Sequence, residues 1–443
     1  MNHYVGDRAV VIGGSIVGTL AARVLSEFYR EVVVLDRDTV LDVYTVRKGA
    51  PHAAHAHAFH SRGYDNVMAL FPDLPADLAE HGIPTPDLGH MRWYFNTRLL
   101  KQTTTGLRSI GAQRPIIEGI LRSKVAALSN VTYRERTEVR SLLASEDGRQ
   151  ISGVRLNPVE SPDAEERLDA DLVIDTTGRG SRTPVWLEEL GYDRPPEERM
   201  TIGLTYTTRL FHHRPGMLDD TQSVNPVASP AHPRGAFFGR VGPQTCILSL
   251  TGILGDKPPT DAEGFLDYVK SLPVSEVYDA VRDAEPMTDA VSFGFPASVR
   301  RHYESMTRFP ERFFVLGDAL CSFNPVYGQG MMVATIEVMA LRDQLLTGSP
   351  PDSAKLRAEL AAIVDAPWAI STNGDLDFPG VPGERTPEVL MGNEFIGKLT
   401  VAATQDPELT NAFLQVAGLK APLTSLMEPD VIERVERGSA AAA

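Results

Sequence analysis

The sequence predicts an α/β fold in which a Rossmann-like domain carries an inserted antiparallel sheet and is followed by C-terminal helices. Three patterns support this prediction. A buried strand, an amphipathic helix and a second buried strand follow one another over residues 9–36. Short alternating segments between Pro-rich and Gly-rich turns occupy residues 201–295, which is typical of an antiparallel sheet. A buried strand returns at residues 313–316 and leads into a helix.

The elements between these landmarks follow in order. The segment 47–60 is a loop rich in His and small residues, and residues 91–96 and 98–101 have the pattern of a hairpin. We expect a helix over 112–128, mainly strand over 131–143, a polar turn at 160–166 and a buried strand at 172–174. The chain from about residue 354 onward is predicted to be helical, with Pro and Gly interruptions.

The composition argues against several classes of function. The 443 residues hold 43 Lys and Arg against 58 Asp and Glu, a net charge of −15, which argues against a nucleic-acid or anionic-membrane partner. Cys246 and Cys321 are the two cysteines, so neither a disulfide scaffold nor a cysteine zinc site is expected. No secretory signal pattern and no stretch resembling a membrane span occur, so we expect a cytoplasmic protein.

The first motif is Gly-Gly-Ser-Ile-Val-Gly at residues 13–18, between the first strand and the helix. Gly13 permits the tight turn, Gly18 permits close packing of helix on strand, and Ser15 is small enough for a pyrophosphate to approach the helix start. Asp36 ends the second strand, where an acidic side chain can bind a ribose hydroxyl. The motif therefore predicts a dinucleotide with a free 2′-hydroxyl, such as NAD or FAD.

Two further motifs follow strands later in the chain. Residues 171–182 read Asp-Leu-Val-Ile-Asp-Thr-Thr-Gly-Arg-Gly-Ser-Arg, and residues 316–319 read Leu-Gly-Asp-Ala. Asp318 can accept hydrogen bonds from a polyol, and the run Asn-Pro-Val-Tyr-Gly-Gln-Gly-Met at 324–331 can present backbone N–H groups at the start of a helix. Two such sites at opposite ends of the chain suit FAD.

In order and spacing, these motifs resemble the flavoprotein monooxygenases of the para-hydroxybenzoate hydroxylase type. Within that family, the motif at 175–181, the run Tyr206–Phe211, and Arg47–Pro51 followed by His55 and His57 are most similar to the actinobacterial FAD-dependent epoxidases of polyether antibiotic pathways. The central motif departs from the wider family, since Thr177 stands where an Asp is usual.

The resemblance implies a set of cofactor contacts. Glycines and Ser15 would hold the pyrophosphate, Asp36 the ribose, Val139 the adenine through its backbone, and the 328–331 turn the flavin ring edge. The implied cofactor-binding residues are Gly13, Ser15, Gly18, Asp36, Arg37, Arg47, Lys48, Arg114, Val139, Thr177, Gly178, Asp318, Pro325, Gly328, Gly330 and Met331. Electrons would come from NADPH, from NADH or from a separate partner flavin reductase.

The resemblance also implies the reaction. Insertion of one oxygen atom from O₂, through a flavin C4a-hydroperoxide, into a hydrophobic natural-product intermediate is expected, with alkene epoxidation as the leading form. Aromatic hydroxylation, flavin-dependent isoprenoid reduction and a flavin-binding module without turnover are the alternatives. Halogenation is disfavoured because the sequence has no Trp-x-Trp-x-Ile-Pro motif. No catalytic side chain is assigned, since the cofactor supplies the chemistry.

The substrate is expected on the inserted sheet, whose apolar side chains favour an alkene or aromatic molecule. The proposed pocket residues are Tyr206, Phe237, Phe293 and His57. The histidines at 52, 55, 57 and 60 fit no metal-binding pattern, so no metal is predicted. The motifs make the FAD-binding domain discontinuous (1–90, 102–200 and 300–350), with a substrate domain formed by 91–101 and 201–299 and a helical segment at 351–443.

Overall fold

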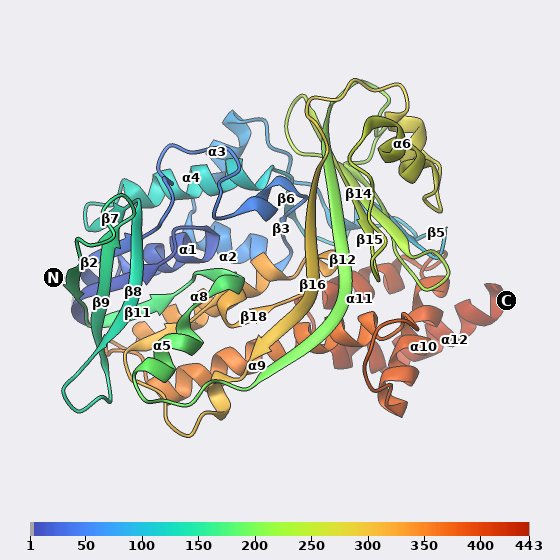
Figure 1. Ribbon diagram of the computed structural model, residues 1–443. Helices are drawn as coiled ribbons and strands as arrows, with labels where there is room; N and C mark the ends of the chain where they lie inside the picture. Colours follow the sequence, from blue (N-terminus) through green and yellow to red (C-terminus); the bar gives the residue numbers. More distant parts are fainter. Residues whose placement is uncertain (1–3, 443) are drawn as a thin grey trace.

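A five-stranded parallel sheet lies at the centre of the nucleotide-binding half of the chain (Figure 1), in a computed structural model that describes residues 4–442. Its strands are β1 (Gly6–Ile12), β2 (Tyr29–Leu35), β7 (Val131–Arg134), β11 (Leu172–Asp175) and β17 (Phe313–Val315). The order β17-β11-β1-β2-β7 is that of a doubly wound sheet. The strand order reverses between β1 and β11, and ligands of such sheets bind at that point, beyond the carboxyl ends of the strands.

Both faces of this sheet are covered, which explains why its strands are continuous apolar runs. Helices α1 (Ile16–Leu25), α2 (Arg62–Leu70), α4 (Arg114–Ala126) and α8 (Gly330–Leu345) pack against one another beside it. A three-stranded antiparallel sheet, formed by β8 (Thr137–Ala144), β9 (Ile151–Pro158) and β10 (Glu166–Asp169), contacts β11 and joins the same apolar core.

An eight-stranded sheet forms the second half of the molecule, and only its β13–β4 pair is parallel among the strands described. Its strands are β4 (Arg92–Phe95), β5 (Arg98–Leu99), β12 (Glu197–His212), β13 (Ser223–Val227), β14 (Arg234–Arg240), β15 (Thr245–Gly252), β16 (Val291–Arg301) and β18 (Cys321–Ser322). The long strands β12 and β16 stand between the parallel sheet and the last three helices of the chain (Figure 1). One face of the sheet packs on α6 (Ala262–Lys270) and α7 (Glu276–Val281).

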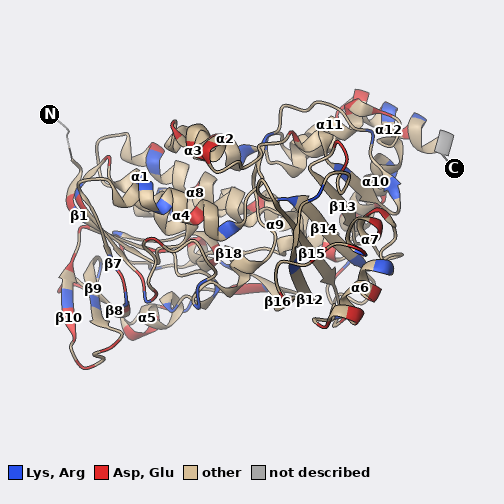
Figure 2. Ribbon diagram, turned by 90° about the horizontal axis from the view of Figure 1, so that it is seen from above, with Lys and Arg blue, Asp and Glu red and all other residues tan. Residues whose placement is uncertain are grey.

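The C-terminal part is helical and reaches back to both sheets. Its helices are α9 (Ser353–Asp375), α10 (Pro387–Ala402), α11 (Pro407–Ala417) and α12 (Pro429–Ala442). Helix α9 contacts β17, α8 and β12, so its carboxyl end lies beside the eight-stranded sheet. Along the ribbon in Figure 2, basic and acidic residues are interspersed over the outer elements. No helix among residues 4–442 combines the length and the hydropathy that crossing a bilayer requires.

The predicted fold class is confirmed, and the differences are local. The segment 131–143, predicted as mainly strand, divides at Arg136 (φ 49°) into β7 of the parallel sheet and β8 of the antiparallel one. Residues 62–80, for which no element was predicted, form α2 and the short helix α3 (Leu74–Glu80). The loop 47–60 contains a 3-10 turn at Pro51–Ala54 and the short strand β3 (Phe59–His60), which pairs with β6 (Ser109–Ile110).

Helix α5 (Thr183–Glu189) follows the β11 turn, and α8 follows the turn after β17. A buried carboxylate fixes the second of these turns. The Glu337 side chain of α8 is fully buried, and its Oε2 accepts a hydrogen bond from the backbone N–H of Gly317, at 2.6 Å. Its Oε1 is buried without a partner. Burial raises the pKa of Glu337 to about 8 from its ordinary value of 4.5, with a further contribution from Asp318.

This pKa predicts how stability varies with pH. In the unfolded chain Glu337 loses its proton near pH 4.5, whereas the native protein holds it up to about pH 8. Its stabilising contribution is therefore complete below the lower value and is lost as the pH rises through the higher one. Between these two pH values the free energy of unfolding of the unaltered protein should fall as the pH rises. We expect Glu337→Gln to make this fall less steep, by up to about 1.4 kcal/mol per pH unit. Denaturant unfolding at several pH values measures this.

The exposed Glu263 of α6 supplies the matched control. Glu263→Gln should leave the pH dependence of unfolding as in the unaltered protein, because an exposed carboxylate keeps similar surroundings on folding. A Glu337→Gln protein whose stability falls with pH as steeply as the control would contradict the role given to Glu337.

Candidate cofactor and substrate site

The turn between β1 and α1 requires glycine at two positions. Gly13 has φ 103°, a conformation that L side chains rarely adopt. A Cβ atom at Gly18 would overlap the carbonyl oxygen of Gly13. Ser15 starts α1 in an extended conformation, and its side chain makes no capping hydrogen bond to the helix. The helix start is therefore left for an anion, which the helix dipole and the first N–H groups favour.

Asp36 connects the end of β2 to this turn. Its Oδ2 accepts a hydrogen bond from the backbone N–H of Gly14, at 2.7 Å, and its Oδ1 accepts one from Asp38, at 2.8 Å. Burial raises the pKa of Asp36, and the nearby Arg47 opposes that rise. The carboxylate thus lies beside the helix start, where the sequence places the ribose of the nucleotide. Its contact with that ribose stays a prediction.

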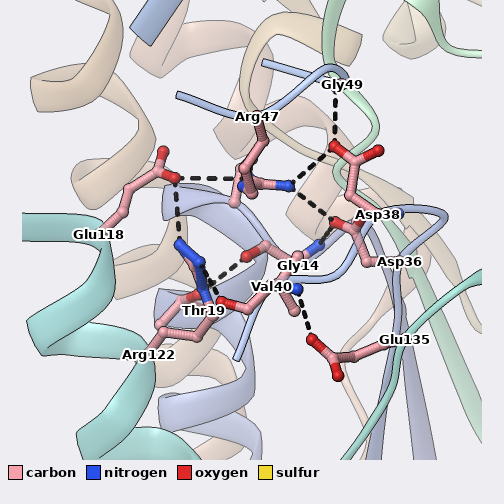
Figure 3. A network of polar contacts seen from close by, with 12 residues as sticks. Gly14, Thr19, Asp36, Asp38, Val40, Arg47, Gly49, Glu118, Arg122 and Glu135 are labelled. Carbon is pink, nitrogen blue, oxygen red and sulfur yellow. Dashed lines mark hydrogen bonds and ion pairs between the residues drawn. The ribbon is translucent and has the colours of Figure 1, made fainter. Parts of the chain in front are cut away.

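Three arginines converge on one buried carboxylate next to the helix start, and Figure 3 shows two of them, Arg47 and Arg122, with Glu118. Glu118 of α4 is 3% exposed. Its Oε1 lies 2.9 Å from Nε of Arg114, and its Oε2 lies 3.4 Å from Nη2 of Arg47 and 3.3 Å from Nη2 of Arg122. Burial alone would raise the pKa of Glu118, but Arg114, Arg47 and Arg122 hold it below its ordinary value. The carboxylate is therefore ionised and is paired with positively charged guanidinium groups.

Arg47 carries that positive charge to the nucleotide turn. Its side chain is 6% exposed, and its Nη2 donates a hydrogen bond to Oγ of Ser15, at 2.6 Å. Its Nη1 lies 3.3 Å from Oδ2 of Asp38 and 3.8 Å from Oδ2 of Asp36. The structure thus brings together three residues that the sequence assigned to the cofactor, Ser15, Asp36 and Arg47.

The histidine loop joins the arginines to the other half of the site. His57 Nε2 lies 3.1 Å from Nη1 of Arg114, which has only protons to donate, so Nε2 is the acceptor. Its Nδ1 then donates to the carbonyl oxygen of His55, at 2.9 Å. Burial, with help from Arg114, lowers the pKa of His57 to about 3. The imidazole is therefore neutral at neutral pH and adds no charge to the site.

The same loop contacts the eight-stranded sheet. His55 Nδ1 lies 2.7 Å from Oγ1 of Thr208, and its ring centre is 5.7 Å from that of Tyr206 and 5.8 Å from that of Phe293. His52 lies 6.0 Å from Phe293. Burial lowers the pKa of His55 to about 4. Within residues 4–442, no three His, Cys, Asp or Glu side chains are arranged to hold a metal ion.

Strand pairing identifies which face of the sheet this loop covers. Tyr206 pairs with Phe293, and Phe237 pairs with Ser249, whose Oγ is 2.6 Å from that of Thr208. Paired residues and alternate residues of a strand share a face. The four proposed pocket residues therefore gather on one side: Tyr206, Phe237 and Phe293 on the sheet face, and His57 in the loop above it. Their contact with a substrate stays a prediction.

The turn after β11 is held by its own carboxylate. Asp175 Oδ1 accepts from both the backbone N–H and the hydroxyl of Thr177, at 2.8 and 2.6 Å, and Oδ2 accepts from Ser181 and Thr183. The hydroxyl of Thr177, which the sequence assigned to the cofactor, is thus used within the turn. Thr176 instead reaches β1, where its Oγ1 donates to the carbonyl oxygen of Ile12, at 2.8 Å.

The Gly-Asp motif lies between this turn and the start of α8. Asp318 is partly exposed and lies close to two glycines. Its Oδ1 is 3.9 Å from the position that a Cβ atom would take at Gly330, and its Cβ is 3.9 Å from the corresponding position at Gly178. Burial raises the pKa of Asp318, while Arg114, Arg179 and Arg301 oppose the rise. Gly328 has φ 67°, and its carbonyl accepts from His60 Nε2 at 2.9 Å.

Met331 is buried in the first turn of α8, next to Gly330, and Pro325 is exposed in the turn that precedes this helix. Val139 is buried on β8, two residues after Thr137, whose N–H donates to the carbonyl oxygen of Asp36 at 2.9 Å. Arg37 and Lys48 are exposed, and within residues 4–442 their side chains make no hydrogen bond or ion pair to the site residues above. Cofactor contacts at these five positions stay predictions.

Sequence reasoning missed three residues that organise the site. Glu118 lies four residues from Arg114 and from Arg122, a spacing that usually marks exposed helix pairs. Arg179 donates to the carbonyl oxygen of Ala297, at 3.0 Å, and lies 4.2 Å above the ring of Phe295, so it joins the two halves. Asp375 ends α9 in a segment without a motif. For Arg179, its place in the 171–182 motif was a usable signal.

Comparison with known proteins agrees with this architecture. No family model matches the chain. Protein Rv3254 of Mycobacterium tuberculosis is 32% identical over 451 residues, covering 97% of this chain and 93% of that protein. Kynurenine 3-monooxygenase of Salinispora arenicola is 24% identical over 392 residues, covering 80% of this chain and 76% of the enzyme. The structure of PqsL, a probable FAD-dependent monooxygenase from Pseudomonas aeruginosa, superposes with a TM-score of 0.62 at 19% identity, covering 85% of this chain and 99% of that one.

The degree of identity and the coverage of both chains relate this protein to the mycobacterial one along nearly their whole lengths. The resemblance to solved structures concerns the fold. The chain therefore belongs to the family of Rv3254 and has the fold of the FAD-dependent monooxygenases.

Proposed function

We propose that this protein is an FAD-dependent monooxygenase that inserts one oxygen atom from O₂ into a hydrophobic natural-product intermediate. One observation carries the proposal: two helix starts lie at one site beside an apolar sheet face. The start of α1 is accompanied by the cation Arg47, and the start of α8 by the hydrogen-bond acceptor Asp318. The similarity to a kynurenine 3-monooxygenase supports it.

The residues present fit FAD. Space at the α1 turn depends on Gly13 and Gly18, where a Cβ would meet the neighbouring backbone, and the start of α1 is not capped by a side chain. Asp36 accepts a hydrogen bond from the backbone N–H of Gly14 in that turn, which places it where a ribose ligand is expected. FAD, once bound and reduced, supplies the chemistry by taking up O₂ and delivering one of its oxygen atoms to the substrate.

The residues of this chain bind and orient the cofactor. We infer that Arg47 and the N–H groups of α1 hold the pyrophosphate, while Asp318 accepts from the polyol. The N–H of Gly328 donates to the carbonyl oxygen of Pro325, at 2.9 Å. The N–H groups of Gly330 and Met331 lie instead at the start of the 16-residue helix α8, where the dipole favours negative charge on the ring edge. Such fixed positive potential stabilises a reduced, anionic ring without rearrangement of the protein.

Around the histidine loop, apolar and neutral side chains line the oxygen-transfer side. Tyr206 and Phe293 on the sheet and the neutral His55 and His57 in the loop form its described surroundings. Water promotes loss of the activated oxygen before transfer, so an apolar, uncharged lining protects the reaction. This lining supports alkene epoxidation, which needs no protein base, as the leading form of the reaction.

Aromatic hydroxylation is the second candidate, because one observation favours it specifically. Hydroxylation of a phenol is usually assisted by a group that accepts the phenolic proton. The buried carboxylate of Asp375 lies near Tyr206 and could serve in that way, since its pKa is raised to about 6 by burial. Electrons would reach either reaction from NADH, NADPH or a partner reductase.

A direct assay tests the proposed function. The purified protein should show a flavin spectrum, oxidise NADH or NADPH or accept electrons from an added flavin reductase, and then transfer oxygen to a polyene or a phenol. With ¹⁸O₂ the product should gain one labelled atom, measured by mass spectrometry. A protein without flavin absorbance would sink the proposal, and a reoxidised flavin with no oxygenated product would favour the reductase or binding-module interpretation.

Replacement of Gly18 tests the nucleotide turn. We expect Gly18→Val to lose bound flavin or to become insoluble, because any side chain there collides with the carbonyl oxygen of Gly13. The control is Gly397→Ala in α10, where a Cβ meets nothing within 4 Å; it should be neutral or stabilising by about 1 kcal/mol. Flavin absorbance per protein and thermal unfolding measure both. A soluble Gly18→Val protein with unchanged flavin would contradict the Rossmann assignment.

Replacement of Asp318 tests the second half of the site. Asp318→Ala should bind FAD at least about ten-fold more weakly, since one charge-assisted hydrogen bond to the polyol is removed. Asp343→Ala, an exposed change on α8, is the control and should retain FAD. Ultrafiltration of each protein with added FAD gives the dissociation constant. Equal retention of FAD by the two variants would remove Asp318 from the cofactor site.

A further inference from the structure

Asp375, the last residue of α9, contacts the turn that precedes α8. It is 1% exposed, and its Oδ1 accepts hydrogen bonds from Nδ2 of Asn324, at 2.7 Å, and from the hydroxyl of Tyr327, at 3.3 Å. Its neighbour Gly374 makes this contact possible, because a Cβ there would overlap the hydroxyl of Tyr327. Helix α9 therefore fixes the turn that leads to Gly328 and the start of α8.

Two polar atoms next to this contact are buried without hydrogen-bond partners. One is Oδ2 of Asp375, and the other is the hydroxyl of Tyr206. Tyr206 is 8% exposed on the sheet face beside His55, and it shares an apolar cluster with Leu376, the residue after Asp375. Burial and the charge of Asp375 both raise the pKa of Tyr206. Because Leu376 follows Asp375 and packs in the cluster of Tyr206, both groups lie in the region between β12 and the end of α9.

An unpaired acceptor beside an unpaired donor defines what can satisfy both. The pKa of Asp375, about 6, leaves it an ionised acceptor at neutral pH, and Tyr206, with its pKa raised well above 10, is a hydroxyl donor. A hydroxyl group can donate to the carboxylate and accept from the phenol at once. A carbonyl would leave the carboxylate unpaired, and a carboxylate would be repelled by it.

We propose that Asp375 and Tyr206 form a binding subsite for a hydroxyl group of the substrate, which is therefore a hydrophobic molecule carrying a phenol or an enol. The inference rests on the proposed function, because it names the substrate class of that site. The rings of Phe293 and His55, 5.8 Å apart and next to Tyr206, favour a flat unsaturated carrier of the hydroxyl. The subsite lies beside the turn assigned to the flavin, so a bound hydroxyl fixes the carrier near the reacting end.

Binding of two matched probes tests the subsite. 1-Naphthol has a hydroxyl, whereas 1-methoxynaphthalene keeps the oxygen acceptor but has no proton to donate to Asp375. Equilibrium dialysis with the purified holoprotein should give 1-naphthol a Kd at least about ten-fold lower than that of the ether, because a site built to bind a hydroxyl rejects an analogue without it. Tyr206→Phe and Asp375→Asn should each reduce this preference to roughly two-fold or less.

Two controls separate the subsite from general effects. Tyr303→Phe removes another buried, unpartnered tyrosine hydroxyl, and Asp377→Asn neutralises an exposed acid two residues after Asp375. Both should keep the full preference. Asp375→Asn retains an amide oxygen that can accept from Asn324 and Tyr327, which favours folding. If Asp375→Asn is nevertheless insoluble, the result for Tyr206→Phe alone decides the test.

The remaining outcomes overturn the proposal. A wild-type protein that does not bind 1-naphthol, or binds both probes equally, has no hydroxyl subsite, and the two buried atoms then serve only an internal water. A preference that survives in Tyr206→Phe also contradicts it. Dialysis involves no turnover, so a protein that shows the predicted preference but lacks FAD would refute the proposed function and leave the subsite standing.

Discussion

The buried carboxylate of Glu118 is the constraint on which the site depends. A carboxylate that is 3% exposed is tolerated only when it is paired, and three guanidinium groups pair with it. Each of these arginines extends to a different part of the molecule: Arg47 to the α1 turn, Arg114 to the histidine loop and Arg122 to the carbonyl oxygen of Val40. Removal of the carboxylate would leave three buried cations to repel one another.

The same contacts join the two halves of the molecule. Arg114 donates a hydrogen bond to His57, and the loop that carries His57 contacts the sheet through the hydrogen bond between His55 and Thr208. Arg179 links the two halves at another point by donating to the backbone of β16, and Asp375 ties the end of α9 to the turn before α8. The apolar sheet face is therefore held at a fixed distance from the nucleotide turn by polar contacts, which are directional, rather than by apolar packing alone.

Sequence reasoning reached those parts of the site where local backbone geometry dictates the residue. Gly13 and Gly18 were predicted because a turn with φ 103° and a backbone contact admit only glycine, and Asp36 because it ends a buried strand at a set distance. Glu118 and Asp375 were not, since nothing in a helical sequence tells a buried charge from an exposed one. Thr177 was read from a family position, yet its hydroxyl is used locally by Asp175.

The charges of the site are separated by position. Arginines gather where α1 begins, so that end favours an anion, whereas the histidines nearer the sheet are kept neutral by burial and by the arginines themselves. Arg114 serves both ends, because its charge favours an anion and also lowers the pKa of His57. This division suits a cofactor whose doubly charged pyrophosphate lies at the arginine end and whose ring lies nearer the sheet. Asp375 is the one ionised group described on the uncharged side. Its Oδ1 accepts from Asn324 and Tyr327, whereas its Oδ2 is buried without a partner, and a buried unpaired oxygen is costly. A substrate hydroxyl that donates to Oδ2, as proposed above, would remove that cost.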